Sequence, residues 1–181
     1  MSKQLEKVLE KSGYQVSLTR TDDRFLRLDE RSRRANSLHA DLFISIHINS
    51  LHDATASGIE LFCLNDDLFE HQHGHHHTRK EGGAHHYRDA RNVLYAESES
   101  VAYAIHEKLL GYARKKNPQV VDRGVLYKVP QVLFGVHMPA VLIELGFLSN
   151  KQEKELLVNP VYQSLLVKGI AEGVQEFFAG R

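Results

Sequence analysis

Apolar residues at helical spacing mark both ends of the chain. Leu5, Val8 and Leu9 share one face of a short helix, and Gly13 provides a left-handed stop after it. Pro160 begins a longer helix with a continuous apolar stripe. A third helix is expected after Asn150, where Asn150 to Glu153 has the form of a capping box. Two more are predicted between these ends, over residues 24–38 and 98–114.

Short runs of apolar and β-branched residues predict strands between the helices. The run from Asp41 to Ile46 is apolar except for Asp41 and Ser45, as expected of a central strand buried on both faces. Strands that alternate with helices indicate one α/β domain, with a twisted, mostly parallel sheet flanked by helices. The predicted strands cover residues 14–19, 41–46, 59–64, 125–129 and 141–144.

Two polar residues end apolar runs in a way that packing does not explain. His47 follows the run that begins at Asp41, and Glu144 follows the run that begins at Pro139. An unpaired charge in a core costs several kcal/mol, and open α/β sheets gather ligands at the carboxyl ends of their strands. The pair therefore suggests a metal ion beside a proton-transfer carboxylate. The competing interpretation is a satisfied core histidine and a glutamate that caps a turn.

Composition narrows the class of protein without identifying it. The chain has 181 residues, enough for one domain, and its 23 basic residues balance its 23 acidic ones. No global field points to nucleic acid, and no apolar stretch is long enough for a transmembrane segment. Cys63 is the only cysteine and is expected to be a small buried hydrophobe. No secretion signal opens the sequence as given.

A histidine-rich stretch interrupts the alternation of strands and helices. Residues 65–92 contain seven of the 12 histidines, together with Gly74, Gly82 and Gly83. We interpret this stretch as a surface insertion between a strand and a helix. Histidine-rich tracts can take up metal. Two interpretations are therefore open, a specific metal site and a surface loop with adventitious affinity for transition metals.

Taken together, the motifs resemble those of the zinc-dependent N-acetylmuramoyl-L-alanine amidases, the peptidoglycan amidases of cell division and sporulation. The likeness covers nearly all of residues 1–181 apart from the insertion, and its most specific part is the segment that contains Glu144. The similar stretches are Leu18 to Asn36, Ser45 to Ser50, Arg123 to Leu133 and Pro139 to Asn150.

The resemblance implies hydrolysis of the amide between N-acetylmuramic acid and L-alanine in peptidoglycan. It implies that His47 is a Zn²⁺ ligand and that Glu144 is the catalytic carboxylate. A zinc-bound water and a neighbouring carboxylate together supply the nucleophile and the proton for the leaving amine. It also implies a periplasmic or extracellular location in the cell envelope. Residues 65–92 correspond to a segment that covers the zinc in some relatives, so an activator protein that displaces it is expected.

The chain departs from the family pattern at its start. The family's first strand, a Gly-His-Gly-Gly turn and a glutamate ligand precede the point where this sequence opens, so only His47 of three expected ligands is matched. A zinc site needs three or four donors, and we therefore expect little or no amidase activity from the chain as given. His52, His137 or the insertion could replace a lost ligand. Arg20, Arg31 and Arg34 could fix a carboxylate or hold the sheet edge.

Two other functions stay open at this point. The chain could be a non-catalytic, amidase-like remnant that binds a muropeptide or a partner. It could also be a histidine-rich metal-binding protein that acts through residues 65–92.

Overall fold

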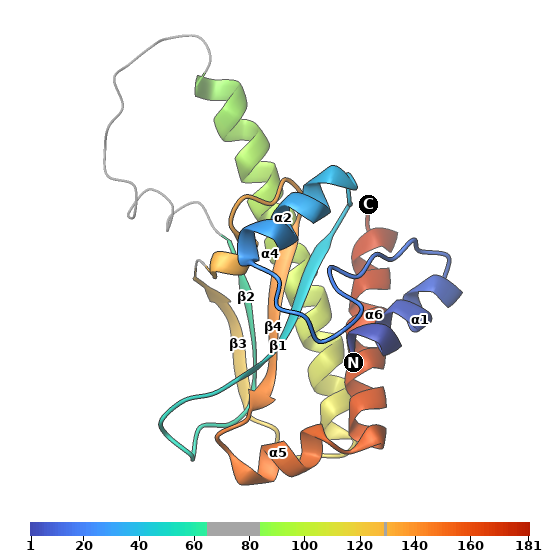
Figure 1. Cartoon of the computed structure of the whole chain (residues 1–181), viewed down its shortest axis with the longest axis vertical. Coiled ribbons are helices and arrows are strands. Elements are labelled where there is room, and N and C mark those ends of the chain that lie inside the picture. The colour runs from blue at the N-terminus through green and yellow to red at the C-terminus, as the bar shows by residue number, and fades with distance from the viewer. Residues whose placement is uncertain (65–83, 129) are drawn as a thin grey trace.

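A computed structural model describes residues 1–64, 84–128 and 130–181. Its centre is a mixed sheet of four strands in the order β1-β4-β2-β3 (Figure 1). Strand β1 is parallel to β4, and β2 is parallel to β3, whereas β2 and β4 are antiparallel. The strands are β1 (Phe43–Asn49), β2 (Ile59–Cys63), β3 (Asp122–Tyr127) and β4 (Ala140–Phe147). The predicted single α/β domain is confirmed, and two of the three strand pairings are parallel.

Helices lie on both faces of this sheet. The long helices α4 and α6 pack side by side across one face, with α1 against α6, whereas α2 lies toward the other face (Figure 1). The helices are α1 (Ser2–Lys11), α2 (Leu28–Ser37), α4 (Ala84–Arg114), α5 (Lys151–Leu157), α6 (Pro160–Ala179) and the 3₁₀ turn η1 (Gln131–Leu133).

The two faces of the sheet are buried to different extents. The larger core holds Leu61 and Ile143 against α4 and α6, and both side chains are fully buried. The opposite face carries a smaller core, where Phe43, Phe62 and Leu142 pack beneath α2 and η1. Because α2 and η1 are short, this second core covers only part of its face.

Two predicted elements differ from the observed ones. Residues 14–19 form no strand, and they pair with none of the four described strands. Helix α4 begins at Ala84 instead of 98, so the end of the predicted 65–92 insertion is helical. Its histidines at 71–77 lie outside the described residues. Gly13 has φ +89°, which confirms the left-handed stop after α1.

Glu153 does not complete the predicted capping box. The side chain of Asn150 caps α5 by accepting hydrogen bonds from the backbone N–H groups of Gln152 and Glu153, as predicted. The carboxylate of Glu153 instead accepts hydrogen bonds from the backbone N–H groups of Gly58 and Phe147, each at 2.7 Å. It thereby ties the end of β4 to the turn that precedes β2.

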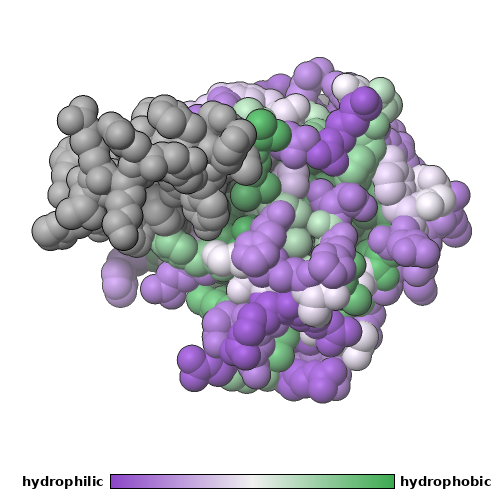
Figure 2. Space-filling model, turned by 90° about the horizontal axis from the view of Figure 1, so that it is seen from above, coloured by the Kyte–Doolittle hydropathy of each residue, from purple (hydrophilic) through white to green (hydrophobic). Residues whose placement is uncertain are grey.

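The exposed surface and the position of Cys63 match what the composition predicts. Seen from above, hydrophilic side chains cover much of the visible face, with apolar residues exposed between them (Figure 2). Among the helices of the described residues, none has the length and apolar character needed to cross a bilayer. Cys63 is fully buried in β2, and burial raises the pKa of its thiol to about 12, so it is a core residue as expected.

Candidate functional site

Strand register brings His47 and Glu144 together. His47 on β1 is the direct partner of Glu144 on β4, and Glu144 is in turn the direct partner of Glu60 on β2. Direct partners on adjacent strands point to the same face of a sheet, with Cβ atoms about 5 Å apart. The three side chains therefore form a row across the sheet, on the face that α2 and η1 cover only in part. We refer to His47, Glu144 and Glu60 as the polar row.

Glu144 is the least compensated member of the polar row. Its side chain is buried, with 8% of the residue exposed, and Oε2 has no hydrogen-bond partner among the described residues. Burial, and to a smaller extent the neighbouring Glu60 carboxylate, raise the pKa of its carboxyl to about 7. A carboxyl group with a pKa near neutrality can both accept and return a proton.

Glu60 is the member that the sequence analysis missed. Its carboxylate accepts hydrogen bonds from Asn49 Nδ2 and from Arg123 Nε, each at 2.7 Å. The guanidinium of Arg123 lies 5.1 Å from the ring centre of Phe147. Glu60 is thus a compensated buried charge that links β1, β2 and β3. The argument that identified His47 and Glu144 could have found it, because Glu60 also interrupts a buried apolar strand.

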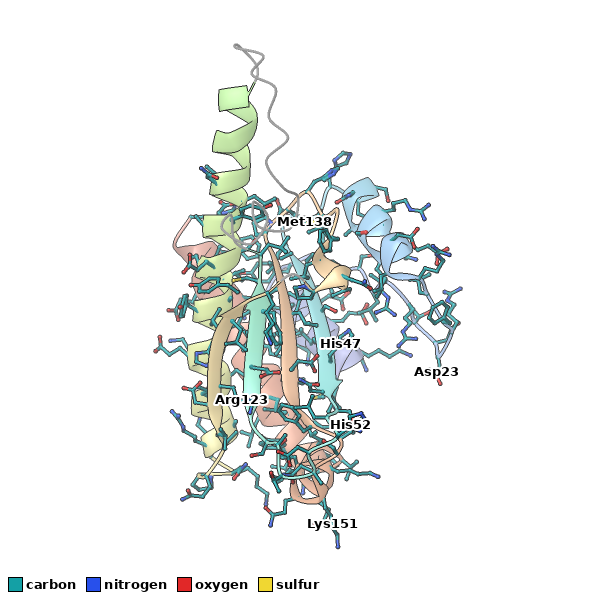
Figure 3. The ribbon with its side chains drawn as sticks, turned by 90° about the vertical axis from the view of Figure 1, so that its left-hand side faces the viewer. Asp23, His47, His52, Arg123, Met138 and Lys151 are labelled. Carbon is teal, nitrogen blue, oxygen red and sulfur yellow. The ribbon has the colours of Figure 1, made fainter. Side chains whose placement is uncertain are left out.

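The surroundings of His47 favour its neutral imidazole form. Burial lowers its pKa, and the positive charges of Arg31 and Arg20 lower it further. A neutral imidazole has a free ring-nitrogen lone pair, which is the form that binds a metal. Figure 3 shows His47 on β1 and Arg123 on β3, with β4 and β2 between them.

The other proposed ligands do not join the polar row. His52 is exposed in the loop after β1, and His137 is exposed, with its backbone N–H bonded to Asn36 Oδ1. His106 on α4 forms a hydrogen bond with Asp122 at 2.7 Å and is thereby engaged away from the polar row. Asn49, two residues after His47, accepts a hydrogen bond from the Ser50 N–H through Oδ1 and donates one to Glu60 through Nδ2.

The donor set falls short of a complete zinc site. Structural and catalytic zinc sites use at least three protein ligands. Within residues 1–64, 84–128 and 130–181, no group of three or more His, Cys, Asp or Glu side chains is arranged to hold a metal ion. His47 supplies one suitable nitrogen, and the carboxylate of Glu60 is already engaged by Asn49 and Arg123. The described residues therefore fit a zinc ion only in part.

An uncompensated carboxylate beside an imidazole, at the carboxyl ends of two parallel strands, is typical of an α/β enzyme domain. Residues 1–176 match the family Amidase_3, described as N-acetylmuramoyl-L-alanine amidase. The chain belongs to this family. Its resemblance to the peptidoglycan amidases is thus confirmed for almost the whole sequence.

Curated relatives show the same likeness. The chain is 25% identical over 178 residues to the Staphylococcus epidermidis protein named "Probable cell wall amidase LytH", covering 98% of this chain and 47% of that protein. It is 30% identical over 170 residues to YqiI of Bacillus subtilis, covering 94% of this chain and 67% of YqiI. The chain thus spans about half the length of the LytH proteins it matches.

Solved structures agree on the fold. The catalytic domain of the amidase CwlV from Bacillus (Paenibacillus) polymyxa var. colistinus has a TM-score of 0.76 and 27% identity, covering 99% of this chain and 82% of that one. An N-acetylmuramoyl-L-alanine amidase from Clostridium difficile 630 also has a TM-score of 0.76, with 30% identity, covering 99% and 80%. The CwlD amidase of Clostridioides difficile, solved in complex with the GerS lipoprotein, has a TM-score of 0.73 and 24% identity, covering 98% and 82%.

Proposed function

We propose that this chain provides catalytic residues for hydrolysis of the amide between N-acetylmuramic acid and L-alanine in peptidoglycan. The observation that carries the proposal is Glu144, a buried carboxylate directly beside His47 whose Oε2 has no hydrogen-bond partner within the described parts of the chain. Membership of the amidase family supports the choice of bond. An isolated buried carboxylate is costly to maintain, which favours a chemical role over a structural one.

Glu144 is the proposed proton-transfer group. Its Oε2 takes a proton from the attacking water and returns it to the departing amine nitrogen of L-alanine. The second transfer matters because an amide nitrogen leaves poorly unless it is protonated. A pKa of about 7 suits both transfers near neutral pH.

His47 is the proposed Zn²⁺ ligand. When bound, zinc polarises the scissile carbonyl and lowers the pKa of a coordinated water. The neutral imidazole of His47 can give one of the bonds that such an ion needs, and further donors are required to complete the set. We therefore propose that the 181-residue chain alone binds zinc weakly and has low activity.

The test uses the variants Glu144→Gln and His47→Ala. Each is made in the 181-residue chain and in a version of the chain that is extended with the amino-terminal segment of an amidase relative. Glu144→Gln is expected to abolish release of new L-alanine amino groups from purified peptidoglycan while zinc, measured by isothermal titration, stays bound. His47→Ala is expected to lose zinc and activity together, whereas His137→Ala, an exposed imidazole, keeps both. A Glu144→Gln enzyme that retained most of its rate would refute the assignment.

Two further functions are separated by the same titration. A histidine-rich metal-binding protein would show several weak sites that persist in His47→Ala. A non-catalytic remnant would bind muropeptide without releasing amino groups, even in the extended version.

Peptidoglycan is the proposed binding partner, and the cell envelope, periplasmic or extracellular, is the proposed location. The name of LytH as a cell wall amidase supports the location, and the CwlD–GerS complex supports a protein partner for such domains. We propose that this partner acts on residues 65–92. We also propose that the enzyme takes part in cell division or sporulation. In the extended version, deletion of residues 65–83 is expected to raise basal hydrolysis. Unchanged hydrolysis would exclude the proposal that this segment covers the active site until a partner displaces it.

A further inference from the structure

An extra residue in β3 places Arg123 beside the polar row. Between two successive strand pairs, β2 advances by two residues and β3 by three, so Arg123 and Gly124 both lie opposite Glu60. Gly124 has φ +81°, a left-handed conformation that favours glycine, and its N–H donates to Asp122 Oδ1 at 2.9 Å. Bulges of this kind turn side chains in new directions and are common beside active sites. The backbone of β3 thus brings Arg123 to Glu60.

The guanidinium of Arg123 is fixed on two sides. Its Nε donates to Glu60 Oε2 at 2.7 Å, and its central carbon lies 5.1 Å from the centre of the fully buried ring of Phe147. Neither Nη atom has an acceptor among the described residues, and 38% of the side chain is exposed. A guanidinium held in this way presents a planar fork of N–H donors, which matches the geometry of a carboxylate.

The proposed reaction assigns the peptide part of the substrate to β2 and β3. In that reaction His47 lies on the carbonyl side of the scissile amide, and Glu144 returns a proton to the amine nitrogen. Because β4 lies between β1 and β2, the amine and the peptide that follows it lie on the side of Glu144 away from His47 (Figure 3). Neighbouring strands are about 4.8 Å apart, so β3 lies about 10 Å from β4. Since Arg123 reaches back to Glu60 on β2, its guanidinium is within reach of the residue that follows L-alanine.

A second cation near β3 separates directed hydrogen bonds from general attraction. The charge of Arg123 is balanced by Glu60, so what it offers a ligand is short-range and directional. Lys128, directly after β3, has its Nζ 5.4 Å from the centre of the ring of Phe62, and no carboxylate of the described residues pairs with it. Lys128 therefore attracts anions at longer range than Arg123 does, but it has no planar fork of donors.

We propose that Arg123 is a specificity residue, which binds a carboxylate on the residue that follows L-alanine through the Nη donors that Glu60 leaves free. The inference rests on the proposed function, because that function sets the direction of the peptide. A substrate with a carboxamide at this position has one acceptor oxygen and, in place of the second, an NH₂ group that meets the Nη donors. The protein therefore prefers the acid to the amide.

The test uses two probes that differ only in the group that Arg123 is proposed to bind. Both are N-acetylmuramoyl-L-alanyl-D-glutamate capped as the methylamide at the γ-carboxyl group, with the α-carboxyl group either free or converted to the amide. Their dissociation constants with the 181-residue chain are measured by NMR titration. We expect the acid to bind about five- to tenfold more tightly than the amide.

Variants of Arg123 separate recognition from a structural role. Arg123→Lys keeps a cation beside Glu60 but lacks the fork, so it should lose most of the preference for the acid. The double variant Arg123→Gln with Glu60→Gln removes both charges of the buried pair and should bind the two probes equally. Lys128→Gln is the matched control, which should weaken the acid by less than about twofold. A merely structural role for Arg123 would weaken both probes by the same factor and leave their ratio unchanged.

The outcomes for Arg123 and for amide hydrolysis are distinguishable. Equal affinity of the native chain for the two probes, no binding of either probe, or a preference that survives in Arg123→Lys and in the double variant would overturn the proposal. A loss of preference in Lys128→Gln as large as in Arg123→Lys would also overturn it, because general attraction would then be the cause. A preference that depends on Arg123 in a chain whose extended version releases no amino groups would refute the proposed function and leave the carboxylate site standing.

Discussion

Replacing Glu144 by glutamine is expected to stabilise the fold at alkaline pH and to change it little in acid. Glutamine has the shape of the neutral acid and never carries the charge that is uncompensated in this site. In the native chain that charge appears when Glu144 loses its proton, and Oε2 has no hydrogen-bond partner among the described residues. The difference between the two proteins is therefore a difference in charge that pH controls.

The magnitude follows from the pKa. The carboxyl of Glu144 has an ordinary pKa of 4.5 and a pKa of about 7 in the fold. The folded chain therefore holds its proton more tightly than the unfolded chain, and stability falls as pH rises from 4.5 to 7. The full loss is about 3 kcal/mol, since one pKa unit is worth about 1.4 kcal/mol. For a domain of this length, that corresponds to about 6–12 °C in melting temperature.

The assay is urea unfolding of both proteins at pH 4.5 and pH 8, with EDTA present to remove bound metal. At each pH we compare the free energy of unfolding of Glu144→Gln with that of the native chain. The advantage of the variant should be larger at pH 8 than at pH 4.5, by about 3 kcal/mol. Glu155→Gln, on the exposed surface of α5, should show no such difference. If the gain from Glu144→Gln were the same at both pH values, the buried charge would not be the cause.

Four further substitutions test particular contacts of the fold. Glu60→Gln should lower the pKa of Glu144 from about 7 to a value that is still above 4.5, because burial, the larger cause of the raised pKa, remains. The pKa of Glu144 is measured by NMR titration of its carboxyl carbon. Glu153→Ala should reduce the free energy of unfolding by about 2–4 kcal/mol, because two buried N–H groups lose their acceptor. Gly173→Ala should destabilise by more than about 2 kcal/mol, because its Cβ would meet the Ile105 Cα at 2.4 Å. Gly111→Ala, with open space around it, should stabilise slightly in the same melts.

The amino-acid sequence predicted only part of the candidate site. His47 and Glu144 stood out because each is a polar residue at the end of an apolar strand, and strand register does place them side by side. Glu60 carries the same signal in β2, yet its bonds to Asn49 and Arg123 join residues far apart in the sequence. No local pattern contains such a pairing.

Two errors in the secondary structure share one physical cause. Residues 14–19 have a strand-like sequence, but a strand needs a neighbour to receive its hydrogen bonds, and none of the described strands pairs with them. Helix α4 begins 14 residues earlier than predicted, in a sequence without apolar periodicity. In both places the decision came from the surroundings of the segment and not from its own residues.

The amino-acid sequence alone determined the α/β class, the stop at Gly13, the cap at Asn150 and the two polar strand ends, because each depends on side chains and backbone within a few residues. The tertiary structure decided the order of the strands and the row formed by His47, Glu144 and Glu60. Those features depend on which strands become neighbours. Only then does burial raise the pKa of Glu144, whereas Arg123 and Asn49 compensate the charge of Glu60.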